Sequence, residues 1–90
     1  MKKAFITVIG ADKVGIIYNV TKMLMEKNIN ILEISQTILD GNFTMIMSID
    51  ITGFEDDFED ISSDFAKLGE KIGVKINLQH EDIFNVMHNI

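Results

Sequence analysis

Apolar residues in the first part of the chain follow two different periods. The segment "KAFITVI" (residues 3–9) predicts a strand in which Ala4, Ile6 and Val8 share one face. After a glycine-containing loop, apolar residues recur at the spacing of a helix that ends near "EKNIN", with Asn28 as a left-handed stop. The following run, "INILEISQTIL" (residues 29–39), is rich in β-branched residues and predicts a long strand.

A hairpin is expected next, because "DGN" separates two strand-like runs and Asp-Gly is a strong short-range hairpin signal. The strand after it, "FTMIMSIDI" (residues 43–51), has an alternation that predicts one buried face. That face comprises Phe43, Met45, Met47, Ile49 and Ile51.

The second predicted helix has the clearest pattern in the chain. Thr52 and Glu55 have the spacing of a capping box, in which each side chain satisfies a backbone N–H of the first turn. An apolar stripe with gaps of three and four residues then predicts a helix face in the core, formed by Phe54, Phe58, Ile61, Phe65, Leu68 and Ile72. Gly73 ends the helix, "VKINLQH" (residues 74–80) predicts a last strand, and the tail "EDIFNVMHNI" (residues 81–90) predicts a short amphipathic helix.

The order of these elements is β-α-β-β-α-β followed by a tail. It predicts an α+β, ferredoxin-like fold: a four-stranded antiparallel sheet in strand order 4-1-3-2, two helices on one face, and a short C-terminal helix. Residues 1–80 are expected to form the domain and residues 81–90 the tail. The second strand then lies at an edge that is long, apolar and free of proline and lysine, and such an edge invites pairing. A homo-oligomer, a dimer or larger, is therefore expected.

Composition narrows the possible partners. The chain has 90 residues, which suits one domain, and it has no cysteine and therefore no disulfide or thiolate chemistry. Its net charge is −6 and its basic residues are eight lysines without arginine, which argues against nucleic acid and multiply charged phosphates. No apolar run spans a membrane, and "MKKAFITVIG" is too strand-like for a signal peptide, so a cytoplasmic protein is expected.

No catalytic or metal-binding constellation is apparent in the sequence. His80 and His88 have no recognisable nucleophile to pair with and are expected to be surface or interface residues. The acidic cluster "EDDFED" (residues 55–60) lacks the glycine and the ligand periodicity of a calcium loop, so it is expected to be a solvated face at a helix N-terminus. We therefore expect a protein that is not an enzyme and that has neither a cofactor nor a bound metal.

The loop "GADKVG" (residues 10–15) raises a specific question. If Asp12 caps the helix, Gly15 lies in its first turn, where glycine costs roughly 1 kcal/mol relative to alanine. A strand that leads into a helix presents free N–H groups suited to a carboxylate, and glycine allows a close approach to the backbone. The pattern fits both a tightly packed helix start and a small-ligand loop.

The run "ITVIGADKVGIIYNVTKMLMEKNINILEISQTI" resembles the opening of an ACT domain, a regulatory module that commonly senses amino acids. The family pattern is a strand, D-x-x-G with a following apolar residue, a helix, and an N-I-x-like start of the second strand. Asp12, Gly15, Ile16 and "NINILEIS" match it, and the resemblance covers about residues 3 to 80. The chain is also similar to an uncharacterised family of small stand-alone ACT proteins, and to the ACT portion of the glycine-cleavage repressor.

This resemblance implies a ligand site between two subunits, in which the first loop of one chain faces the second strand of the other. The residues implied are Asp12, Lys13, Val14, Gly15, Ile16 and Ile17 from one chain, and Asn28, Asn30 and Ile31 from the other. The expected function is to bind a small amino acid or a related metabolite and to act on a separate protein. The alternative is a ligand-free dimerisation or protein-interaction module, since many ACT domains only dimerise.

Overall fold

A computed structural model describes residues 1–11 and 14–88 of the chain, without the side chains of residues 39 and 85–88. Four strands and three α-helices make up this part, and a short 3-10 helix, η1, precedes the second α-helix. In chain order the elements are β1 (Lys3–Ala11), α1 (Ile16–Glu26), β2 (Asn30–Leu39), β3 (Asn42–Asp50), η1 (Glu55–Asp57), α2 (Phe58–Ile72), β4 (Lys75–His80) and α3 (Glu81–His88).

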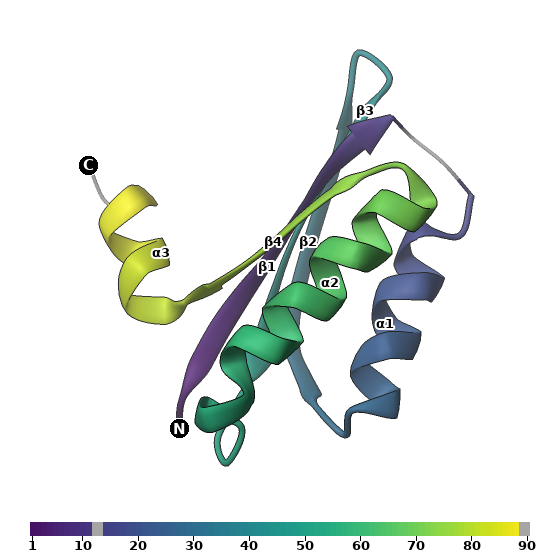
Figure 1. Cartoon of the computed structure of the whole chain (residues 1–90). Helices are drawn as coiled ribbons and strands as arrows, with labels where there is room; N and C mark the ends of the chain where they lie inside the picture. Colours follow the sequence, from purple (N-terminus) through teal and green to yellow (C-terminus); the bar gives the residue numbers. More distant parts are fainter. Residues whose placement is uncertain (12–13, 89–90) are drawn as a thin grey trace.

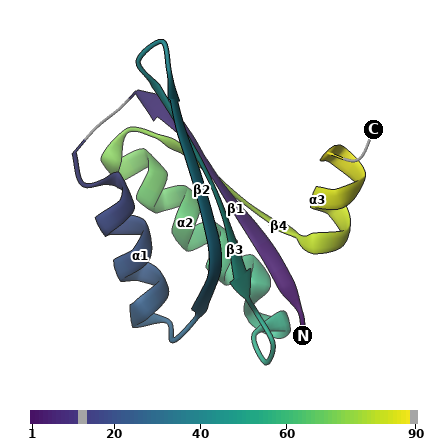
Figure 2. The same ribbon diagram turned by 180° about the vertical axis from the view of Figure 1, so that it is seen from behind.

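The four strands form one antiparallel sheet in the order β2-β3-β1-β4. Helices α1 and α2 lie side by side on one face of the sheet, and α3 lies on the opposite side (Figures 1 and 2). The predicted ferredoxin-like fold, its strand order and its C-terminal helix are therefore confirmed. Among the described residues, no helix is both long enough and apolar enough to cross a bilayer.

The core lies between the sheet and the two helices. Ala4, Ile6 and Val8 of β1 are fully buried there, and the predicted apolar face of β3 is buried throughout, from Phe43 to Ile51. The stripe predicted for the second helix is also confirmed. Its central residues Ile61, Phe65 and Leu68 are buried, while Phe54, Phe58 and Ile72 pack partly buried against the core.

The predicted turns occur where the backbone requires a positive φ. Asp40 and Gly41 have φ of 52° and 78°, and two such residues in succession suit the twist of a two-residue hairpin. Asn28 ends the turn after α1 with φ of 59°, and Gly73 caps α2 with φ of 79°. The local signals in the sequence therefore identify these chain reversals correctly.

The capping box expected at Thr52 and Glu55 is wrong. Helix α2 begins only at Phe58, after η1, and the Thr52 hydroxyl instead accepts the backbone N–H of Lys2 at 3.0 Å. The Glu55 carboxylate accepts the N–H of Gly53 at 3.0 Å. Hydrogen bonds from the Thr52 hydroxyl and then from its N–H hold the pKa of Asp50 below its usual range. Thr52 thus ties the end of β3 to the start of β1.

Candidate functional site

The turn between β1 and α1 explains why residue 15 is glycine. Helix α1 begins at Ile16, and Gly15 is its N-cap with φ of 90° and ψ of 0°. The expectation that Gly15 lies inside the first helical turn is therefore wrong. An L-residue rarely adopts this φ, so glycine relieves backbone strain here. Asp12 and Lys13, expected in the same loop, lie outside the described residues.

Asn19 fixes the geometry of this turn, and sequence reasoning missed it. Its backbone N–H and its side-chain Nδ2 both donate to the carbonyl oxygen of Gly15, at 2.9 Å and 2.7 Å. The only signal for this contact is the spacing of four residues. Within the described helix α1, the first turn carries no acidic side chain. The positive end of the helix dipole is therefore not neutralised by a carboxylate of the same turn.

The loop end of α1 lies beside a shallow apolar groove. Val14 is fully exposed, whereas Ile16 is buried at 3% and belongs to the core. Ile17 is 38% exposed and faces β2 and β3. Together with Gln36, Thr37, Ile38 and Phe43 it lines a groove of about 390 Å³.

The other end of α1 carries a second groove. Asn28, Asn30 and Ile31, the residues implied for the second half of a ligand site, lie together there. Its volume is about 490 Å³, and its remaining lining residues are Thr21, Leu24, Met25 and Ile29. Asn28 and Asn30 are exposed and Ile31 is 36% exposed, so these side chains are accessible.

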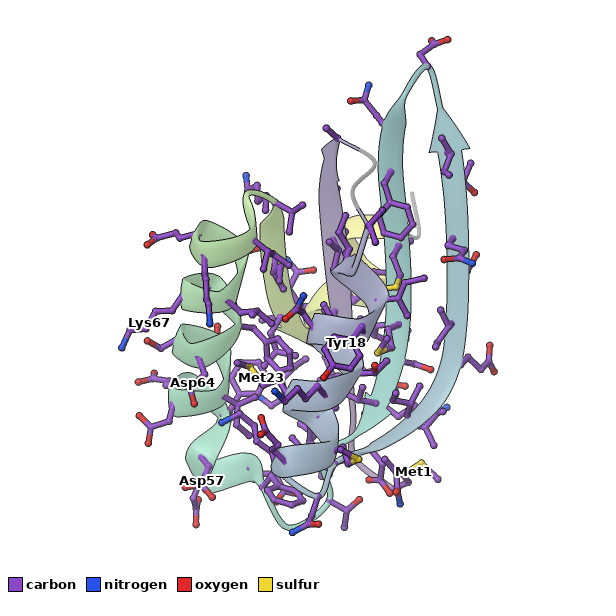
Figure 3. The ribbon with its side chains drawn as sticks, turned by 90° about the vertical axis from the view of Figure 1, so that its right-hand side faces the viewer. Met1, Tyr18, Met23, Asp57, Asp64 and Lys67 are labelled. Carbon is purple, nitrogen blue, oxygen red and sulfur yellow. The ribbon has the colours of Figure 1, made fainter. Side chains whose placement is uncertain are left out.

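A single chain does not bring these two groups together. Helix α1 has 11 residues, and at 1.5 Å per residue it separates the Ile17 groove from the Asn28 groove by roughly 16 Å. Between them the outer surface of α1 carries Tyr18, which is 64% exposed and projects from the helix (Figure 3). A site that uses both ends therefore requires two chains.

The acidic cluster considered in the sequence lies elsewhere, in η1 and the start of α2, and His80 at the end of β4 packs beside it. The ring of His80 stacks on Phe58, with centroids 3.9 Å apart and an interplanar angle of 12°. A shallow groove next to this pair is lined by Glu55, Asp56 and other carboxylates of the cluster. Among the side chains that the structure describes, no group of three or more His, Asp or Glu residues is placed to hold a metal ion.

Comparison with known proteins identifies relatives along the whole chain. The family model described as the ACT domain matches residues 3–79. A UPF0237 protein of Methanococcus maripaludis is 50% identical over 90 residues, which cover 100% of both chains. An ACT domain protein from Streptococcus pneumoniae superposes with a TM-score of 0.82 at 41% identity, over 92% of this chain and 93% of that one. A protein described as a glycine cleavage system transcriptional repressor shares the fold, with a TM-score of 0.76 at 20% identity over 88% of this chain and 45% of its own.

Proposed function

The chain belongs to the ACT domain family, and from that premise we propose that it is a regulatory protein that senses a small amino acid or a related metabolite. An ACT domain supports a regulatory, ligand-binding role in general. More specifically, we propose that the ligand binds between two copies of the chain and that the complex acts on a separate protein. The protein itself is not an enzyme in this proposal.

The observation that carries the proposal is the position of the two grooves at opposite ends of α1. Strand β2 runs alongside this helix, from Asn30 at one end to Ile38 beside Ile17 at the other. A second copy paired antiparallel to β2 would therefore bring its Asn30 and Ile31 toward the Ile17 groove. Two equivalent sites would form, and ligand binding would be coupled to the interface between the copies.

The chemistry of the loop end suits an amino acid. The backbone N–H groups at the start of α1 would hold the ligand carboxylate, because the helix dipole favours a negative charge there. Asp12 or backbone carbonyls would hold the ammonium group. The apolar surface of Ile17, Ile38 and Phe43 would then contact the ligand side chain. Lys13, Val14 and Gly15 would shape the entrance from the loop side.

The test is a thermal-shift screen of the purified protein against the standard amino acids, with the oligomeric mass measured in parallel. A ligand at 100 times its dissociation constant stabilises the folded state by about 2.7 kcal/mol, which is easily detected in a domain of this size. One clear stabilising ligand is the expected result. No stabilisation by any of the compounds would contradict the proposal.

Two glycine variants separate ligand binding from backbone strain. Gly15→Leu is expected to abolish the ligand-induced shift, because its side chain would project at the loop end of α1. Gly53→Leu is the matched control, since Gly53 has φ of 87° against 90° for Gly15, and an added Cβ would meet no atom within 4 Å. Both variants should lose similar stability, and only Gly15→Leu should lose the response. Normal ligand binding by Gly15→Leu would rule out this placement of the site.

The second candidate is a ligand-free dimerisation or protein-interaction module. The exposed apolar residues of β2 favour it, since Ile34 and Ile38 are 46% and 58% exposed. This candidate predicts an oligomer that no amino acid stabilises. A partner pull-down would then replace the ligand screen as the informative experiment.

A further inference from the structure

A cavity of about 450 Å³ lies at the end of the sheet opposite the loop between β1 and α1. The start of β1, η1 and the start of α3 come together there (Figure 1). The residues that line the cavity are Met1, Lys2, Lys3, Glu55, His80, Glu81, Asp82 and Ile83. None of them lines the two grooves beside α1, so this cavity is separate from the site described above.

The cavity is lined by charges of both signs that do not pair with each other. Two ammonium groups, of Lys2 and Lys3, border it together with three carboxylates, of Glu55, Glu81 and Asp82. Among the described side chains, the only ion pair lies elsewhere and joins the end of α1 to α2, so these five charges do not neutralise one another. The volume lies within the range of small-molecule sites. A ligand that carries both an ammonium group and a carboxylate would neutralise both sets at once.

The start of α3 determines which part of such a ligand lies on which side. A helix N-terminus attracts an anion, but Glu81 and Asp82 occupy the first turn of α3 and complement its dipole. The α3 side of the cavity therefore favours a cation, and the β1 side, with its two lysines, favours a carboxylate. The two sides are held together, because Phe84 of α3 stacks on Phe5 of β1 with centroids 4.1 Å apart.

The acidic groove beside the Phe58–His80 stack adjoins this cavity, and both are lined by His80 and Glu55. The His80 ring is fixed by its stack on Phe58, so it forms a fixed wall of both spaces. Apart from these two rings, every lining residue of the groove is a carboxylate. A ligand that extends from the cavity into the groove therefore has to carry a positive charge at its far end.

We propose that the cavity binds a basic amino acid. Its α-carboxylate lies at the two lysines of β1, its α-ammonium group lies at the start of α3, and its side-chain cation extends past His80 into the acidic groove. Two lysines against three carboxylates in the cavity itself also favour a ligand with a net positive charge. The described lining residues of the grooves beside α1 are uncharged, so the basic side chain distinguishes the two sites. Because the ligand bridges β1 and α3, its binding stabilises the docked position of α3.

The test is isothermal titration calorimetry of the natural protein with L-lysine and with three probes that each lack one of its charged groups. Cadaverine lacks the carboxylate, ε-aminocaproate lacks the α-ammonium group, and L-norleucine lacks the side-chain cation. L-Lysine should bind, and each probe should bind at least about tenfold more weakly because it loses one charge-assisted contact. Equal affinities for cadaverine and L-lysine would reduce the site to an acidic surface and overturn the proposal.

Charge variants locate the site. Lys3→Gln and Glu81→Gln should each weaken L-lysine binding by about threefold or more, since exposed ion pairs are individually weak. Lys75→Gln is the matched control, because it removes the same charge from an exposed position at the other end of the sheet, opposite Ile9. Its affinity for L-lysine should match that of the natural protein. An equal loss in Lys75→Gln and Lys3→Gln would mean that only the net charge matters, which would contradict this placement.

Gly15→Leu distinguishes this inference from the proposed function. L-Lysine binding that Gly15→Leu leaves intact and Lys3→Gln weakens supports the cavity, whatever the amino-acid screen finds at α1. Binding that only Gly15→Leu abolishes assigns L-lysine to the site at α1, which supports the proposed function and overturns this inference. Binding that both variants weaken means that the two sites are not separate, and it overturns the inference as well. Stabilisation by another amino acid without any binding of L-lysine overturns this inference alone.

Discussion

Gly69 in α2 provides a test of how closely the helix approaches the sheet. An ideal Cβ on this residue would lie 2.6 Å from the carbonyl oxygen of Val74 and 3.2 Å from Cγ1 of Ile76. The first contact is with backbone, so the helix or β4 has to move to accommodate Gly69→Ala. The carbonyl of Gly69 also accepts the N–H groups of Gly73 and Val74, at 2.8 Å and 2.9 Å, which holds the chain reversal in place.

Two effects of Gly69→Ala oppose each other. Alanine favours the helix by about 1 kcal/mol relative to glycine. Overpacking of a close contact costs about 1 to 3 kcal/mol, and here the contacted atom is part of the backbone. We expect the clash to dominate, with a net loss of up to about 2 kcal/mol and a fall in Tm of up to roughly 15 °C for a domain of this size.

The assay is thermal unfolding followed by circular dichroism, with a matched control on the same helix. Ala66 is exposed on α2, so Ala66→Gly changes helix propensity without a packing contact. It should lower the stability by about 1 kcal/mol, which calibrates the propensity term in this helix. If Gly69→Ala raised the Tm by as much as Ala66→Gly lowered it, the close approach to Val74 would cost no stability. That result would refute the expectation that the clash dominates.

Two further predictions concern contacts between elements. The pKa of Asp64 lies below its usual range because Lys27 donates a hydrogen bond to its carboxylate at 2.5 Å. The ionised carboxylate therefore stabilises the fold above the unfolded pKa of about 3.9. This contribution is lost as the pH falls through the folded pKa. Asp64→Asn should therefore have a lower Tm than the natural protein at pH 6, and the two melting curves should converge toward pH 3; a constant difference across this range would contradict the assignment. Phe84 stacks on Phe5 with centroids 4.1 Å apart, so a double-mutant cycle of Phe5→Ala and Phe84→Ala should give a coupling energy of about 1 kcal/mol, whereas a value near zero would mean that α3 is not held by this pair.

Most of the fold follows from local signals in the sequence. Asp40-Gly41 between two strand-like runs identifies the hairpin because few other residues adopt a positive φ at both positions. The stripe around Phe65 identifies α2 because its spacing repeats over five intervals. The second strand is recognised as an edge because the crossover rules fix the strand order. The hairpin and the helix stripe depend on residues close together in the chain, and the edge position follows from the order of the elements.

The features that the sequence does not predict depend on residues far apart. Thr52 forms its hydrogen bond with Lys2, fifty positions away, and this contact replaces the capping box that its neighbours suggest. The bulge at Leu32 has no glycine to mark it, since it arises from pairing with β3. The geometry of the candidate site is likewise not apparent from the sequence, because the distance between Gly15 and Asn28 depends on the length and direction of α1. Its ligand contacts remain a prediction.

The central position of β1 has a consequence for how the protein folds during synthesis. Of the four strands in the sheet, β1 is made before the others, yet it pairs with both β3 and β4, and β4 is made after them. The β2–β3 hairpin joins neighbouring segments and can form early, whereas one side of β1 has no partner until residues 75–80 emerge. Until β4 emerges, the nascent sheet therefore exposes one edge of an apolar strand that only β4 can cover.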